Sequence, residues 1–158
     1  MDKARYIALI GIGVGAVLIG LGYYRSHTPA PPVPEPSPVH YSLTVLATES
    51  WKNSEITVRS GQRISVFASG RVVWDKMLPA VGPDGSYPAN TVEQPNDFPL
   101  PSAPCGSLLM KVGSTIYPVG SSRTVTVNES GGLLFMINDR YNYLHNNSGS
   151  FQVELEVR

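Results

Sequence analysis

The feature that most limits the fold is an alternation of apolar and polar residues, in short runs that begin at Tyr41 and continue to the end of the chain. In the last run, Ser150 to Val157, one Phe, two Val and one Leu would face one side, and Gln and two Glu the other. A period of two is typical of a half-buried strand, whereas an amphipathic helix has a period near 3.6. We therefore expect strands in a sheet with one covered face.

Seven or more such strands are expected after residue 40, separated by turn residues. They include residues 42–45, 56–59, 64–68, 107–113, 123–128, 133–138 and 150–157. The 15 glycines and 14 prolines, with only 15% charged residues, also favour turns and short strands. The sequence predicts one all-β domain, an antiparallel β-sandwich. The irregular stretch 75–104 is too long for a simple connection, so we expect it to carry function.

An uncharged segment near the N-terminus, Tyr6 to Tyr24, is long enough to cross a membrane. Its 19 residues match a hydrocarbon core of about 30 Å at 1.5 Å per helical residue. It ends in two tyrosines and Arg25 rather than in the small residues of a cleavage site, so we expect an uncleaved signal anchor, with a cleaved signal peptide as the alternative. Lys3 and Arg5 outnumber Arg25, which predicts a single-pass inner-membrane protein whose C-terminal domain is periplasmic or otherwise extracytoplasmic.

Residues 26–40 are rich in proline and follow this segment directly. Dense proline favours extended polyproline II and therefore a semi-rigid stalk, although a disordered tether is an alternative. The predicted organisation is a transmembrane anchor over 1–25, a stalk over 26–40 and a β-sandwich domain over 41–158.

Composition and the isolated reactive residues argue for binding rather than catalysis. The 12 basic and 12 acidic residues balance, so no basic surface for nucleic acid is expected. The predicted domain has one histidine, His145, and one cysteine, Cys105, in no catalytic motif, and its carboxylates are too scattered to nominate a pair. We expect Cys105 to be a small buried residue and the protein not to be an enzyme.

Side-chain oxygens gather in the segment that precedes the last strand. Asp139 follows one predicted strand, and Asn146 and Asn147 precede the next. Carboxylate, amide and backbone oxygens are the ligands that Ca²⁺ prefers, and they would leave open positions for the hydroxyls of a ligand. The alternative is that these residues only cap turns. The spacing leaves both interpretations open.

The chain resembles the calcium-dependent galactophilic (PA-I/LecA-like) lectins of bacteria. The likeness rests on "INDRYNYLHNNSGSFQVELEV", "APCGSLLMKVG" and "GPDG", and it extends over most of residues 43–157. It implies a small jelly-roll-like β-sandwich with one Ca²⁺ at its apex, to which neighbouring hydroxyls of a galactose-type sugar bind directly. The stretch from Asn138 to Phe151 would form a hairpin of that fold.

The resemblance also implies a set of site residues. The calcium ligands would be the side chains of Asp139, Asn146 and Asn147 and the backbone carbonyls of Tyr143 and Trp74. The sugar would contact Asp139 and Asn146.

The chain departs from the family where the sugar is held. The family's His-Pro-x-Gln segment is replaced by "SYPANTVEQPNDF", in which Gln94 or Asn90 is a candidate substitute. Arg140, Tyr141 and His145 are larger than the family's residues, so they would either contact the sugar or close the site. We take Arg140 and Gln94 as the further candidate sugar-binding residues.

Two functions remain open. The first is a membrane-tethered, calcium-dependent carbohydrate-binding module for a galactose-type glycan. The second is a structural or interaction domain that binds an envelope protein through the 75–104 stretch. Homo-oligomers are possible in either case, because the family's lectins are tetramers.

Overall fold

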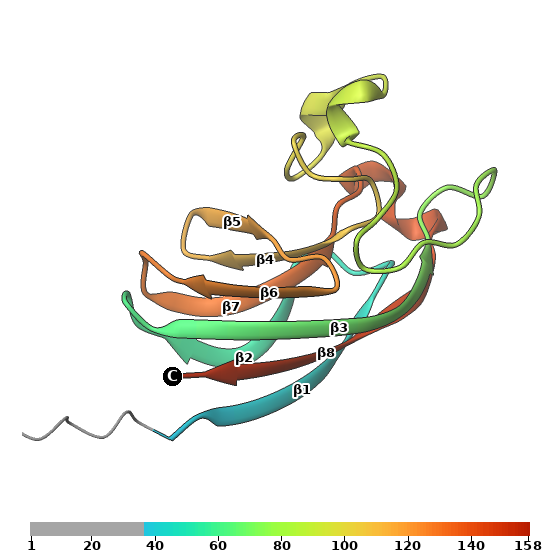
Figure 1. Ribbon diagram of the computed structural model, residues 1–158. Coiled ribbons are helices and arrows are strands. Elements are labelled where there is room, and N and C mark those ends of the chain that lie inside the picture. Colours follow the sequence, from blue (N-terminus) through green and yellow to red (C-terminus); the bar gives the residue numbers. More distant parts are fainter. Residues whose placement is uncertain (1–36) are drawn as a thin grey trace, which may run out of the picture. The chain divides into compact units, whose positions relative to one another are not determined.

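The computed structural model describes residues 37–158, in which eight strands form two antiparallel sheets, one over the other (Figure 1). The first sheet has the order β1-β8-β3-β6, with β1 Val39–Leu46, β8 Ser148–Val157, β3 Arg63–Val73 and β6 Ser122–Thr126. The second has the order β2-β7-β4-β5, with β2 Lys52–Val58, β7 Gly131–Ile137, β4 Leu108–Val112 and β5 Thr115–Pro118. The predicted all-β antiparallel sandwich is confirmed.

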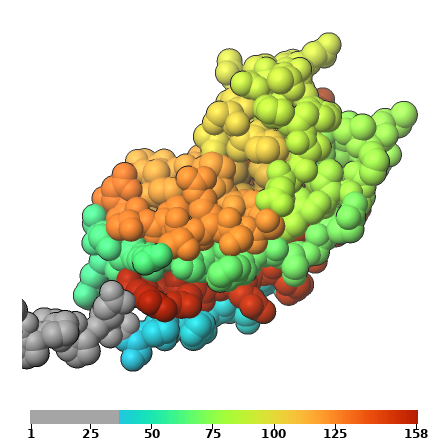
Figure 2. All heavy atoms as spheres, viewed as in Figure 1, coloured from blue at the N-terminus to red at the C-terminus, as the bar shows by residue number. Residues whose placement is uncertain are grey.

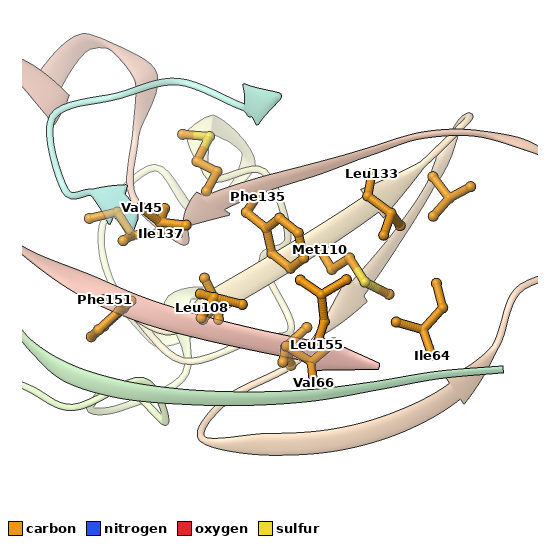
Figure 3. Packing of buried hydrophobic residues seen from close by; sticks show 14 of the residues in the cluster. Val45, Ile64, Val66, Leu108, Met110, Leu133, Phe135, Ile137, Phe151 and Leu155 are labelled. Carbon is orange, nitrogen blue, oxygen red and sulfur yellow. The ribbon is translucent and has the colours of Figure 1, made fainter. Parts of the chain in front are cut away.

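The apolar faces of the two sheets meet in the core (Figure 3). Phe151, Val153 and Leu155 of β8 are buried, whereas the residues between them are exposed or half-buried, as the alternation predicts. The second sheet contributes Phe135 of β7 and Met110 of β4, both fully buried. Burial of these side chains supplies the main stabilisation of the domain, at about 1.5–3 kcal/mol for each large apolar residue.

The chain alternates between the sheets, and this corrects the expected hairpin. β7 and β8 lie in different sheets, joined by the 3-10 helix η3, Tyr141–Asn146, at one end of the sandwich. Both strands bury an apolar face in the same core, but from opposite sides. Alternation in a sequence shows which residues of a strand are buried. It does not show which sheet the strand joins.

The strand bounds differ from the expected ranges at most ends, and two differences change the description of the domain. Residues 115–118 form β5, which the sequence did not indicate, because all four residues are half-buried and no alternation results. β1 begins at Val39, which pairs with Val157, so the first strand starts two residues before the predicted domain start at Tyr41.

The long irregular segment between β3 and β4 covers the end of the sandwich beside η3 (Figures 1 and 2). It contains two one-turn 3-10 helices, η1 Ala89–Thr91 and η2 Pro95–Asp97. The side chain of Asn138 holds the last part of this segment, residues 100–104, in place. The Nδ2 of this fully buried side chain donates to the carbonyls of Leu100 and Ala103 at 3.0 Å and of Pro104 at 3.2 Å, and its Oδ1 accepts from the Leu100 N–H at 3.2 Å.

The predicted membrane anchor and most of the predicted stalk lie outside the described residues. Within residues 37–158, no helix is long and apolar enough to span a membrane.

Candidate functional site

Five of the seven predicted site residues line one cavity of about 190 Å³ at the end of the sandwich, and Asn147 and Gln94 do not. Three segments supply its wall: the chain just after β3, the chain just after β7, and η3. The lining residues are Trp74, Asp75, Lys76, Asp139, Arg140, Tyr143 and Asn146. The antiparallel sheets bring these segments together because β3 and β7 both end at this edge.

Asp139 and Asn147 form the polar base of the site. Asp139 is 1% exposed and Asn147 6% exposed. Asn147 Nδ2 donates to Asp139 Oδ2 at 2.9 Å and to the Ala47 carbonyl at 3.2 Å, while the backbone N–H of Arg140 donates to Asp139 Oδ1 at 2.8 Å. Asn147 Oδ1 is buried and accepts no hydrogen bond within the described part of the chain. A buried oxygen without a donor is costly unless a cation, water or ligand meets it.

Burial raises the pKa of the Asp139 carboxyl above its ordinary value. Hydrogen bonds from Asn147 and from the Arg140 backbone, together with the Arg140 charge, act in the opposite direction. Asp75 faces the same space, and its charge adds to the rise in the pKa of Asp139. Asp75 and Asp139 therefore place two carboxylates at the cavity, one of them poorly solvated, and a cation close to these carboxylates is favoured.

Arg140 forms one wall of the cavity and stacks on an aromatic ring. Its guanidinium carbon lies 4.1 Å from the centre of the Tyr143 ring and 5.8 Å from that of Phe98. Its Nε is buried and makes no hydrogen bond to residues 37–158. Arg140 thus covers one face of the Tyr143 ring. A ligand in the cavity would therefore meet a planar guanidinium cation as well as the tyrosine ring.

A second cavity, of about 330 Å³, shares Arg140 and Tyr143 with the first. Its remaining lining residues are Asn96, Asp97, Tyr141 and Asn142. Gln94, the predicted substitute for the family's sugar-contacting segment, precedes η2, is exposed, and lines neither cavity.

Asp75 and Lys76 line the site although no motif in the sequence predicts them as site residues. Both follow Trp74, which had been proposed for its backbone carbonyl, and the charged pair directly after it was the available signal. Asn96 and Asp97 also went unnoticed. Nothing local indicates that η2 would lie against η3, because only the tertiary packing brings them together.

Cys105 lies in the core rather than at the surface. Cys105 is fully buried and free, and burial raises the pKa of its thiol to about 11, with a further contribution from the Asp139 charge. The prediction of a small buried cysteine is confirmed. Among residues 37–158, no three His, Cys, Asp or Glu side chains are placed to hold a metal ion, so a metal site here would depend on amide and backbone oxygens as well.

Comparison with known proteins places the fold in a family. The model of the family described as "PA-IL-like protein" matches residues 40–158. The chain belongs to this family. The resemblance to the PA-I/LecA-like lectins is thereby confirmed, and the sandwich is a lectin-like domain.

One sequence relative and one solved structure are similar to this domain. Lectin A of Photorhabdus laumondii is 31% identical over 113 residues, which are 69% of this chain and 84% of that protein. The solved structure of the EclA N-terminal domain, a PllA-like lectin, superposes with a TM-score of 0.61 at 24% identity and covers 75% of this chain and 96% of the solved one. At that identity the second likeness supports the fold alone.

Proposed function

We propose that residues 39–158 form a calcium-dependent carbohydrate-binding domain whose site is the cavity around Asp139. The observation that carries this proposal is the buried carboxylate of Asp139 at the cavity wall, hydrogen-bonded to Asn147, whose own Oδ1 is buried and unsatisfied within residues 37–158. The family membership and the name of Lectin A support it, because a lectin binds sugars.

The donors around the cavity fit calcium. The side chains of Asp139, Asn146 and Asn147 and the backbone carbonyls of Trp74 and Tyr143 are all hard oxygen donors, and Ca²⁺ takes 6–8 of them in flexible geometry. Asp75 supplies a second carboxylate at the cavity wall. Bound calcium would offer open positions to neighbouring hydroxyls of a sugar.

The cavity suits a small ligand. Its volume of about 190 Å³ lies below the ~300–1,000 Å³ typical of pockets for drug-sized molecules, which favours one sugar ring over a larger group. Asp139, Asn146 and Arg140 border the space that the ring would occupy. A galactose-type glycan is the first ligand to test, with binding and not catalysis as the activity.

We further propose that the N-terminal segment tethers this domain to the inner membrane and holds it outside the cytoplasm. The uncharged run from residue 6 to 24 and the prolines that follow it support this placement. Cell fractionation, with protease added to spheroplasts, tests it: the domain should remain with membranes and be digested from the outside. A domain found in the soluble cytoplasmic fraction would contradict the proposal.

The test of function is a titration of Ca²⁺ into the full chain, kept in a detergent whose head group is not a sugar. Galactose and a panel of monosaccharides then follow, with and without chelator. Asp139→Asn removes the charge at constant size, and Asp84→Asn is the matched control, since Asp84 accepts from the Ser121 N–H at 2.7 Å and lines neither cavity.

We expect calcium to bind the parent chain and the control, to bind the Asp139 variant at least about tenfold more weakly, and sugar to bind only with calcium. Calcium binding without any sugar binding would contradict the lectin function and favour a domain that binds an envelope protein. Absence of calcium binding would show that the asparagines only cap turns.

A further inference from the structure

Two unpartnered nitrogen donors lie in the wall of the site, where a calcium ion would need only oxygen acceptors. The Nε of Arg140 and the indole Nε1 of Trp74 are buried, and neither finds an acceptor in residues 37–158. Trp74 is 6% exposed, packs edge-on against Tyr87, and lines the same cavity as Arg140. Buried donors without acceptors cost free energy, and the Arg140 side chain borders the cavity, so a ligand that offers an oxygen acceptor to its guanidinium is favoured.

Arg140 is held in place without being neutralised. Stacking on Tyr143 orients the planar guanidinium, but the guanidinium forms no ion pair with the acidic residues described in the structure. Arg140 also lies in the wall shared by the two cavities. An oriented guanidinium with free donors is the usual partner of a carboxylate or phosphate, which it binds through two parallel hydrogen bonds.

The charges around the first cavity also favour an anionic ligand. Asp75 and Asp139 contribute two negative charges and Lys76 and Arg140 two positive ones, so a divalent cation would leave an excess of two positive charges. Lys76 is exposed and, like Arg140, has no acidic partner in the described structure. A neutral sugar would leave this excess uncompensated, whereas an anionic sugar would reduce it.

We propose that the natural ligand is an acidic glycan, a hexose with an anionic group such as the carboxylate of a uronic acid, and that Arg140, with Lys76, recognises this group beside the cation. This inference rests on the proposed function and names its ligand class. In this arrangement two ring hydroxyls face the calcium position while the anionic group meets the guanidinium between the cavities.

The decisive comparison uses two sugars that differ at one carbon. Galactose and galacturonate are titrated into the calcium-loaded full chain, with galactose 6-phosphate as a third arm to distinguish a carboxylate from a phosphate. Heats of calcium binding to each sugar alone are subtracted. We expect galacturonate, galactose 6-phosphate or both to bind about tenfold or more tightly than galactose, and this advantage to fall as salt is added.

Single-residue variants test which side chain causes the preference for an acidic sugar. Arg140→Gln should lower the ratio of acidic-sugar to galactose affinity to near one, Arg140→Lys should lower it partly, and Lys76→Gln should lower it less. Arg59→Gln, an exposed arginine away from both cavities, is the control and should leave the ratio unchanged. An unchanged ratio in Arg140→Gln would overturn the role of Arg140.

Two further measurements do not depend on affinity for sugar. The Nε–H NMR signal of Arg140 should shift on addition of the acidic sugar and not of galactose. Arg140→Gln should bind calcium more tightly than the parent chain, because a repelling charge has been removed.

The results separate this inference from the function on which it rests. If galactose binds with calcium and the acidic sugars bind no better, the lectin function stands and the acidic ligand class is wrong. If no sugar binds in any arm, the proposed function fails and this inference fails with it.

Discussion

Asn147 donates a hydrogen bond of 2.9 Å to the buried carboxylate of Asp139, across the connection that joins β7 to β8. Asn147 has a second acceptor in the Ala47 carbonyl, at 3.2 Å, at the end of β1. One amide therefore ties the candidate metal ligand to the first strand, and it serves the fold as well as the site.

Asn147→Ala should destabilise the domain even without metal. It removes both hydrogen bonds and leaves an Asp139 oxygen buried without a donor, which costs about 1–3 kcal/mol. Urea unfolding in the presence of a chelator measures the loss. Asn146→Ala is the matched control, because its side chain lines the cavity without a hydrogen bond in the described structure, and its change should stay within about 0.5 kcal/mol. Equal losses for the two variants would contradict the structural role of Asn147.

Asn138→Ala should loosen the long segment over the site. The change leaves three carbonyls, those of Leu100, Ala103 and Pro104, without their amide donor, and we expect a loss of at least about 2 kcal/mol in the free energy of unfolding. Cleavage after the exposed Glu93 by a glutamate-specific protease should become faster, since local opening exposes the backbone.

Asn128→Ala serves as the control for the Asn138 variant. Its side chain is exposed and accepts only from the Tyr117 hydroxyl, at 2.8 Å. This variant should keep the parent chain's cleavage rate after Glu93. Slow cleavage in the Asn138 variant would show that other contacts hold the segment.

Phe135→Ala should be among the most destabilising single changes in the domain. The ring is fully buried between the sheets, and removal of such a side chain costs about 3–5 kcal/mol through lost burial and the cavity left behind. Phe67→Ala removes the same ring from the outer face of β3, where it is 54% exposed, and should cost less than about 1 kcal/mol. Chemical unfolding of both variants measures the difference, and similar losses would contradict the placement of the core.

Stability should fall in acid through Glu129. Hydrogen bonds from the Thr115 hydroxyl and from the backbone and hydroxyl of Ser114 lower the pKa of Glu129 below its ordinary value of 4.5. A carboxyl whose pKa is lower in the folded state stabilises the fold above the unfolded pKa, and this contribution disappears as the pH falls through the folded pKa.

The test compares the parent chain with Glu129→Gln between pH 7 and pH 3. The stability difference between them should be largest above about pH 4.5 and should shrink below it. Glu93→Gln, which changes an exposed carboxylate on the 75–104 segment, is the control for the loss of one surface charge. A difference that is constant with pH would show that the Glu129 charge does not act through these bonds.

Much of the site followed from short stretches of sequence. Asp139, Asn146 and Asn147 stand close to one another in the chain, and their order could be matched to a family because strand ends and turns conserve local geometry. Asn96 and Asp97 could not be found in this way, because they come from a segment with no periodic pattern, the later part of which Asn138 holds in place.

The sequence by itself determined that strands follow residue 40, which face of most of these strands is buried, and that side chains with oxygen donors gather before the last strand. These properties depend on residues that are neighbours in the chain, and alternation with a period of two records them directly. Only the tertiary structure decided that β7 and β8 lie in opposite sheets, that Arg140 stacks on Tyr143 between two cavities, and that Asp75 faces Asp139. These relationships depend on long-range packing of the two apolar faces, which brings together segments that no local pattern relates to one another.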